Sequence, residues 1–281
     1  MKISEAIARI KGYHRGISRG KPIDDATSRD QILYGDPDRE LTGIVTTCYA
    51  SVDVIRKAKE LGANLIISHE ALFWNHGDHT DWLEDNKTFQ AKTALLDEGG
   101  ITVWRNHDYI HSGIPLGDAW VDGIFYGLAK HLGWESYAIG GEPMNEPKFE
   151  LPQAVPVREL GKFLMEKLNL TGIKTLGSLD SMARRVWVCG HIMGFKDNEI
   201  LKQTEEEDFD VLITLECIDY TVAEYVRDSA MVGRPKTILA TGHFNTEEPG
   251  MLYMTEWLPA ALGEAVPTTF VPCADMYQFI V

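Results

Sequence analysis

Three apolar runs of the chain each stop at histidine and acidic residues, and imidazole with carboxylate is a donor set that binds divalent metal ions. These groups are His69 with Glu70, His107 with His111, and His243 with Glu247. A short apolar run bounded by polar residues is typical of a buried strand in an α/β sheet, and such sheets bind ligands at the carboxyl ends of their strands. We therefore expect the three strand ends to meet over one metal site.

The spacing of the last two groups supports this expectation. Residues four apart lie on one face of a helix, with their Cβ atoms about 5–6 Å apart. If the chain turns helical after the strands, each pair can hold one ion or give one ligand to each of two adjacent ions. Three of these four imidazoles with the two carboxylates, and no thiolate, suit Zn²⁺, Mn²⁺, Fe²⁺, Co²⁺ or Ni²⁺ rather than Ca²⁺. About five ligands exceed a closed tetrahedral zinc site and suit two ions that share a bridging carboxylate or water.

The elements that position these residues recur along the chain. A strand at 43–48, a helix capped by Ser51 and ended at Gly62, and the strand that leads to His69 form a βαβ unit. The second half shows the same order, with strands at 185–189, 209–216 and 237–240 separated by helices at 198–206 and 221–228. This pattern predicts an α/β fold built by internal duplication of one repeat.

Proline and glycine mark the expected boundary between the repeats. The segment from Gly140 to Pro156 contains four prolines. We predict a first repeat at 1–140, a proline-rich linker at 141–156 and a second repeat at 157–281, whose C-terminal segment packs back on the first. The polar segment from Gly16 to Arg39, with its Gly-Lys-Pro and Gly-Asp-Pro turns, is expected to be a loop.

Composition limits the class of protein. The chain has 281 residues, of which 44% are hydrophobic and 25% charged, as in ordinary globular proteins. Its formal net charge of −15 argues against nucleic acid or an anionic membrane as the main partner, although an acidic solvated surface is enough to explain it. The four cysteines are far apart, with no pair that suggests a disulfide framework or a thiolate zinc site. Without a signal-like or membrane-spanning stretch, we expect a cytoplasmic protein.

Three stretches resemble the motifs of the NIF3-like dinuclear metal-centre proteins. Residues 62–74, Gly-Ala-Asn-Leu-Ile-Ile-Ser-His-Glu-Ala-Leu-Phe-Trp, are similar to the first motif, and residues 101–111, Ile-Thr-Val-Trp-Arg-Asn-His-Asp-Tyr-Ile-His, look like the second. Thr-Gly-His-Phe-Asn-Thr-Glu at 241–247 is close to the last motif and is the most specific. The resemblance implies a NIF3-like fold of two intertwined α/β repeats with mixed, mostly parallel sheets. It also implies a toroidal homohexamer and a pair of metal ions.

The resemblance also implies which residues bind the ions. His69 matches the first ligand, and His243 and Glu247 match the last two. The family usually has histidine where this chain has Glu70, and aspartate where it has His111. These two exchanges are reciprocal and leave the formal charge on the ions unchanged, so we expect both positions to bind metal. Which metal is preferred and which carboxylate bridges stay open.

Further residues are candidates for catalysis. His107 matches a family histidine near the metals, and it either supports the ligands or contacts substrate. Glu216 stands where the family has the aspartate of Thr-Gly-Asp, and it is either a pocket carboxylate or a charge at a helix N-terminus. With Glu70, these are the expected catalytic residues. His76 and His79 could line the cleft, but a solvated loop is the favoured interpretation. The remaining histidines, His14, His131 and His191, have no ligand-like partner at a useful spacing and are expected to be structural.

Two functions fit these residues. In the first, the protein is a hydrolase in which two divalent ions activate a bridging water against a carbonyl, amidine or phosphoryl centre, and Glu70 or Glu216 moves the proton. Relatives within the family that the chain resembles are often labelled GTP cyclohydrolase type 2, but the chain has no guanine-reading or triphosphate-binding motif. In the second, it is a non-catalytic metal-binding regulatory or scaffold oligomer. The expected partners are further copies of the chain and a small-molecule substrate.

Overall fold

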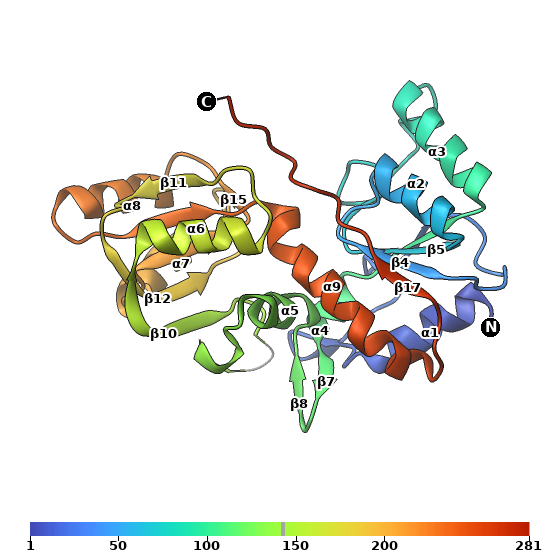
Figure 1. Ribbon diagram of the computed structural model, residues 1–281, viewed down its shortest axis with the longest axis horizontal. Helices are drawn as coiled ribbons and strands as arrows, with labels where there is room; N and C mark the ends of the chain where they lie inside the picture. The colour runs from blue at the N-terminus through green and yellow to red at the C-terminus, as the bar shows by residue number, and fades with distance from the viewer. Residues whose placement is uncertain (142–143, 281) are drawn as a thin grey trace. The chain divides into compact units, whose positions relative to one another are not determined.

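The computed structural model describes residues 1–141 and 144–280 and has the α/β architecture that the sequence pattern predicts. The chain divides into two compact units. The first is formed by Met1–Gly127 with Gly250–Cys273, and the second by Leu128–Pro249 with Ala274–Val281. Each unit contains one mixed sheet with helices packed on it (Figure 1). Neither unit is continuous in sequence, because the chain returns to each of them near its C-terminus.

The sheet of the first unit has three parallel strands at its centre. Its strands lie in the order β17-β4-β5-β6-β3. Their bounds are Thr268–Phe270 for β17, Ile44–Thr47 for β4, Leu65–Ser68 for β5, Thr102–Arg105 for β6 and Ile32–Tyr34 for β3. Only β3 is antiparallel to its neighbour. Helices α2 (Val52–Leu61) and α3 (Lys87–Gly99) connect the parallel strands and lie together above β4 and β5 (Figure 1).

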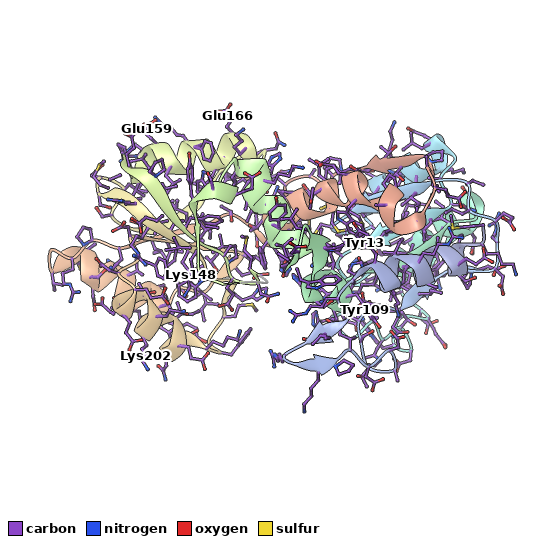
Figure 2. The ribbon with its side chains drawn as sticks, turned by 90° about the horizontal axis from the view of Figure 1, so that it is seen from below. Tyr13, Tyr109, Lys148, Glu159, Glu166 and Lys202 are labelled. Carbon is purple, nitrogen blue, oxygen red and sulfur yellow. The ribbon has the colours of Figure 1, made fainter. Side chains whose placement is uncertain are left out.

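Local signals fix the helices of this unit. The Ser51 hydroxyl accepts a hydrogen bond from the Val54 backbone amide, and Gly62 ends α2 with a φ of 67°, so both predicted caps are confirmed. Helix α1 (Ile3–Tyr13) lies below the sheet in Figure 1. The ring of Tyr13, labelled in Figure 2, stacks on Trp257 of helix α9 with a centroid distance of 5.5 Å. The second half of α9 (His243–Leu262) therefore belongs to this core.

The second unit repeats the same design. Its sheet has the order β11-β16-β14-β12-β10-β9. The bounds are Lys174–Gly177 for β11, Thr237–Ala240 for β16, Val211–Thr214 for β14, Met182–Val188 for β12, Lys148–Pro156 for β10 and Ala138–Ile139 for β9. Strands β12, β14 and β16 are parallel, and the other three are antiparallel to their neighbours. Helices α7 (Asp197–Glu206) and α8 (Val222–Met231) connect the parallel strands.

Register shows that the two halves are structural repeats. In the first unit Val45, Ile66 and Val103 are aligned across three strands and belong to the core beneath α2. In the second unit Trp187, Leu212 and Ile238 are aligned in the same way, in the core that includes residues of α7 and α8. The predicted duplication is therefore present in the fold as well as in the pattern of the sequence.

Two segments differ from what the sequence suggested. Between Gly16 and Arg39, which we expected to be a loop, the chain forms β1 (Ile17–Ser18), β2 (Lys21–Pro22) and β3. These strands have at most three residues, too few to show an alternating pattern. In the segment 141–156, expected to be a linker, residues 142–143 lie outside the described residues and residues 148–156 are strand β10. Its register against β12 shifts between Glu150 and Val155, which accommodates the proline between them.

The remaining elements are short, apart from three helices. They are α4 (Asp108–Ser112), β7 (Ile114–Leu116), β8 (Ala119–Val121), α5 (Gly123–Leu132), the 3₁₀ turn η1 (Glu135–Tyr137), α6 (Val157–Lys167), β13 (His191–Ile192), β15 (Glu216–Cys217) and α9. Among the residues that the structure describes, no helix combines the length and apolar character needed to cross a bilayer.

Candidate metal centres

Three imidazoles of the first unit gather at the carboxyl ends of β5 and β6. His69 follows β5 directly, His107 precedes the short helix α4, and His111 lies within that helix. The ring centroids of His69 and His107 are 4.7 Å apart, and each lies 5.0 Å from the ring of His111. One ligand atom from each of the three lies within 4.8 Å of the others. The three side chains can therefore hold a single ion.

The orientation of each ring is fixed by an oxygen that accepts a hydrogen bond from its Nδ1. The three bonds run from His69 to the Asn106 carbonyl (3.0 Å), from His107 to Asp108 Oδ1 (2.9 Å) and from His111 to Asp122 Oδ2 (2.7 Å). A carbonyl or carboxylate oxygen only accepts, so the proton is on Nδ1 and the Nε2 lone pair is available as a ligand. Oxygen partners of this kind support metal-binding histidines in proteins generally.

Asp30 builds the turn that carries two of these rings, and sequence reasoning missed it. This residue is 2% exposed. Its Oδ1 accepts hydrogen bonds from the His107 backbone amide (3.0 Å) and the Asn106 side chain (2.9 Å), and its Oδ2 accepts one from the Asp108 amide (2.8 Å). Burial raises the pKa of Asp30. Because Asp30 lies in the segment predicted to be a loop, more than 70 positions before its partners, no local pattern could have identified it.

Asp122 is a second support that the sequence analysis missed. Its side chain is buried, and Oδ1 caps helix α5 by accepting hydrogen bonds from the backbone amides of Ile124 (2.9 Å) and Phe125 (3.0 Å). Its other oxygen holds His111. A helix cap could have been predicted here, because aspartate just before a helical pattern is a strong N-cap signal. The bond to His111 depends on tertiary structure and could not.

Glu70 lies between a buried arginine and the imidazoles. Its Oε2 accepts a hydrogen bond from Arg105 Nη2 at 2.7 Å, and its Oε1 is 3.5 Å from His107 Nε2. The Arg105 side chain is fully buried and also pairs with Asp78 (2.8 Å) and donates to the His69 carbonyl (3.2 Å). Arg105 therefore fixes the Glu70 carboxylate beside the three rings. A direct bond from Glu70 to metal, and its part in catalysis, stay predictions.

The second unit brings together a different group. Strands β13 and β15 pair so that His191 is opposite Glu216, and His191 Nδ1 donates to Glu216 Oε2 at 2.5 Å. His243 Nδ1 donates to the other oxygen of Glu216. At the start of α9, His243 Nε2 lies 3.1 Å from Glu247 Oε2, as the four-residue spacing predicted. The expectation that His191 has no ligand-like partner is wrong, because strand register places it there rather than spacing along the chain.

Glu216 is a charged carboxylate at the wall of a cavity. Burial alone would raise its pKa, but the hydrogen bonds from His191 and His243 outweigh burial and lower the pKa of Glu216 to about 2. The cavity has a volume of about 350 Å³ and is bordered by the strand ends at Leu215 and Thr241 and by the C-terminal segment at Phe279. Glu216 is thus among the residues that line this cavity, and its part in catalysis stays a prediction.

The candidate residues are thus contributed by both units. The first unit holds His69, Glu70, His107 and His111, and the second holds Glu216, His243 and Glu247. That both groups serve one pair of ions stays a prediction.

In the loop after Glu70, both histidines are exposed as expected; the Nε2 of His76 accepts a hydrogen bond from Arg29 at 2.6 Å.

Two α/β repeats that carry imidazole and carboxylate groups at the carboxyl ends of parallel strands define a class: duplicated α/β proteins with candidate metal-binding clusters. The family model described as Duf34/NIF3 (NGG1p interacting factor 3) matches residues 21–275, and the chain belongs to this family. The resemblance found in the three motifs is therefore confirmed over most of the chain.

Relatives extend this result. The GTP cyclohydrolase 1 type 2 homolog of Clostridium perfringens is 24% identical over 253 residues, which are 89% of this chain and 90% of that protein. The structure of a Bacillus cereus protein related to NIF3 has a TM-score of 0.71 at 14% identity, covering 100% of this chain and 99% of that one. Reduced HcgD from Methanocaldococcus jannaschii has a TM-score of 0.61 at 15% identity, covering 95% and 97%. At these identities the two solved structures support the fold alone.

Proposed function

We propose that this protein is a metal-dependent hydrolase that holds divalent ions on its imidazole clusters. The observation that carries the proposal is the arrangement of His69, His107 and His111, whose Nδ1 atoms are all held by oxygens. Three nitrogen donors with a nearby carboxylate fit Zn²⁺, Mn²⁺, Fe²⁺, Co²⁺ or Ni²⁺. His243 and Glu247 are the expected ligands in the second unit, and two ions are the number we propose.

A bound ion of this kind supplies a Lewis acid, which lowers the pKa of water and polarises the bond under attack. The chain's own residues perform the other tasks. The Glu70 carboxylate, fixed by Arg105 and close to His107, is placed to accept a proton beside the rings. In the second unit Glu216 lines the cavity, where its negative charge can orient a hydrogen-bond donor of the substrate.

The cavity favours a small, mainly apolar substrate over a nucleoside triphosphate. Its described lining includes Leu170, Met193 and Ile218, and its one cationic side chain is that of Lys174. Lys174 Nζ already donates to the Cys217 carbonyl at 2.8 Å. The lining therefore offers few free hydrogen-bond donors to the oxygens of a triphosphate. We therefore propose a cyclic amide, amidine or ester as substrate, although the relatives carry the cyclohydrolase name.

The proposal includes the assembly and the compartment. We propose a homohexamer, as the family resemblance implies, and a location in the cytoplasm, as expected from the sequence. Light scattering coupled to size-exclusion chromatography measures the assembly, and the expected result is six times the chain mass of 31.5 kDa. A species with the mass of one chain would contradict the oligomer without touching the metal chemistry.

The function is tested with metal-stripped protein reloaded with Zn²⁺, Mn²⁺ or Fe²⁺. Hydrolysis is measured on dihydrouracil, p-nitrophenyl phosphate and GTP, for wild type, His69→Ala and the matched control His79→Ala, an exposed histidine of the same unit. We expect metal-dependent turnover of the cyclic amide that is lost in His69→Ala and kept in His79→Ala. A fully loaded sample that melts at a higher temperature but turns over none of the three would instead support the non-catalytic metal-binding oligomer.

A further inference from the structure

We infer that the second unit carries a metal site formed by His191, Glu216 and His243, which takes one divalent first-row transition ion such as Zn²⁺ or Fe²⁺. The inference rests on the proposed function for the class of ion. It goes beyond that proposal because His191 and Glu216 stand outside the ligand set expected from the sequence.

The fold brings the three side chains to one edge of a sheet. His191 follows β12, Glu216 follows β14, and His243 follows β16, and these three strands are parallel and adjacent. The carboxyl ends of such strands are where α/β sheets bind ligands. The short pair β13–β15 adds a second constraint, because it fixes His191 opposite Glu216. The convergence is thus set by the backbone and does not depend on flexible side chains.

The donor set and its geometry suit a cation. One ligand atom from each residue lies within 4.8 Å of the other two, and the ring centroids of the histidines are 5.2 Å apart. Two imidazoles and one carboxylate form the donor set that binds Fe²⁺ or Zn²⁺ with positions left for water or substrate. All three side chains are partly exposed, so an ion can reach them.

Comparison of the two repeats shows a difference in the charges around two equivalent carboxylates. Thr214 Oγ1 donates to the carbonyl oxygen of Glu216, two positions along the chain, as Ser68 Oγ donates to that of Glu70. Glu216 and Glu70 therefore occupy equivalent positions. Strand register places Arg105 next to Ser68 in the first repeat.

The equivalent neighbour of Thr214 in the second repeat is Ala240. Arg105 neutralises Glu70, but alanine offers no charge to Glu216. Instead both oxygens of Glu216 face the Nδ1 atoms of imidazoles, and binding of a cation between them would release the protons of these two nitrogens. A divalent ion would supply the positive charge that arginine supplies in the first repeat. The carboxylate of Glu247 lies on the other side of the His243 ring, 3.1 Å from Nε2, and is not part of this donor set.

The test counts ions on the full-length chain. Metal-stripped protein is titrated with Co²⁺, followed by its visible absorption, and bound metal is counted by elemental analysis after gel filtration. The variants are His191→Ala and Glu216→Gln, and the control is His131→Ala, a histidine of the same unit whose Nε2 is bonded to the Lys167 carbonyl. We expect each of the two variants to lose one equivalent of Co²⁺ per chain, or at least tenfold in affinity, and the control to lose none.

Wild-type ion count and affinity in both His191→Ala and Glu216→Gln would overturn the inference. His191→Asp separates loss of a donor from loss of structure, because it keeps a ligand and should retain the ion where alanine does not. His69→Ala separates this inference from the proposed function. If His69→Ala keeps every ion while His191→Ala loses one, the first-unit cluster does not bind metal and the site at His191 is supported. If His69→Ala loses an ion while His191→Ala keeps every ion, the site at His191 is refuted and the proposed function is unaffected.

Discussion

Lys92 offers a sharp test of the packing behind the first imidazole cluster. It lies on α3 and is 1% exposed. Its Nζ donates to the Leu72 carbonyl (2.7 Å) and to Tyr49 Oη (3.2 Å), and lies 4.5 Å from the centre of the Tyr49 ring. Burial lowers the pKa of Lys92 from 10.5 to about 7. The amine thereby holds the chain two residues beyond Glu70, and Lys92→Met removes it at similar side-chain length.

The effect of this change depends on pH. Since the pKa of Lys92 is lower in the folded protein, the unfolded chain binds more protons between pH 7 and 10.5, and the free energy of unfolding rises with pH in that window. Each pH unit in this window adds about 1.4 kcal/mol to the free energy of unfolding, so the whole pKa shift of Lys92 corresponds to roughly 5 kcal/mol. The methionine variant lacks this term. We expect the wild type to gain about 3 kcal/mol relative to Lys92→Met between pH 8 and pH 10.

The measurement is urea unfolding of both proteins at pH 8, 9 and 10, with chelator present throughout. Lys87→Met is the control, because Lys87 begins the same helix and is exposed. Its difference from wild type should stay constant over this range. A difference between wild type and Lys92→Met that does not change with pH, or that shrinks as pH rises, would refute the assignment of a lowered pKa to this amine.

Three further predictions concern other buried polar groups. Asp122→Asn should weaken metal binding by about 10- to 100-fold in a chelator competition titration, because the amide no longer holds the His111 tautomer. Asp30→Ala should lower the free energy of unfolding by about 3 kcal/mol in urea, because it leaves backbone amides of the turn at His107 without their acceptor. Burial lowers the pKa of His14 to about 4, so the free energy of unfolding should fall by about 3 kcal/mol as the pH drops from 6.5 to 4. In His14→Leu the melting temperature should depend less on pH over this range than in the wild type. The same pH dependence in both proteins would count against the lowered pKa.

The sequence alone predicted the features that depend on residues close to one another along the chain. Caps, periodic apolar residues and turns predicted the helix from Ser51 to Gly62 and the strands around it, and the order of elements predicted the duplication. The four-residue spacing predicted the contact of His243 with Glu247, because α9 starts where the strand ends. In each case the signal lies within a few residues of the feature.

The supports of the candidate sites were not predictable in this way. Asp30 acts on a turn far along the chain, and Arg105 sits on a strand where it looks like an ordinary member of a buried run. His191 meets Glu216 only through the register of two short strands. Such contacts depend on which strands become neighbours, and a single sequence contains no direct record of that.

The exchange of charge at positions 70 and 111 relative to the family motif has a physical explanation in these supports. Glu70 has Arg105 as its cationic partner, and His111 has Asp122 as its anionic partner. An aspartate at position 111 would place two carboxylates in contact in a buried setting, which costs free energy or forces one of them to take up a proton. We therefore expect His111→Asp to destabilise the protein strongly.

The partner residue should control this penalty. In the double variant His111→Asp with Asp122→Asn, the amide removes the like-charge contact, so the double variant should be more stable than His111→Asp alone by at least 1 kcal/mol in urea unfolding. The double-mutant cycle isolates this coupling from the effect of losing the imidazole. If the two changes are simply additive, Asp122 does not determine which residue position 111 can carry, and the ion-binding set must be explained without it.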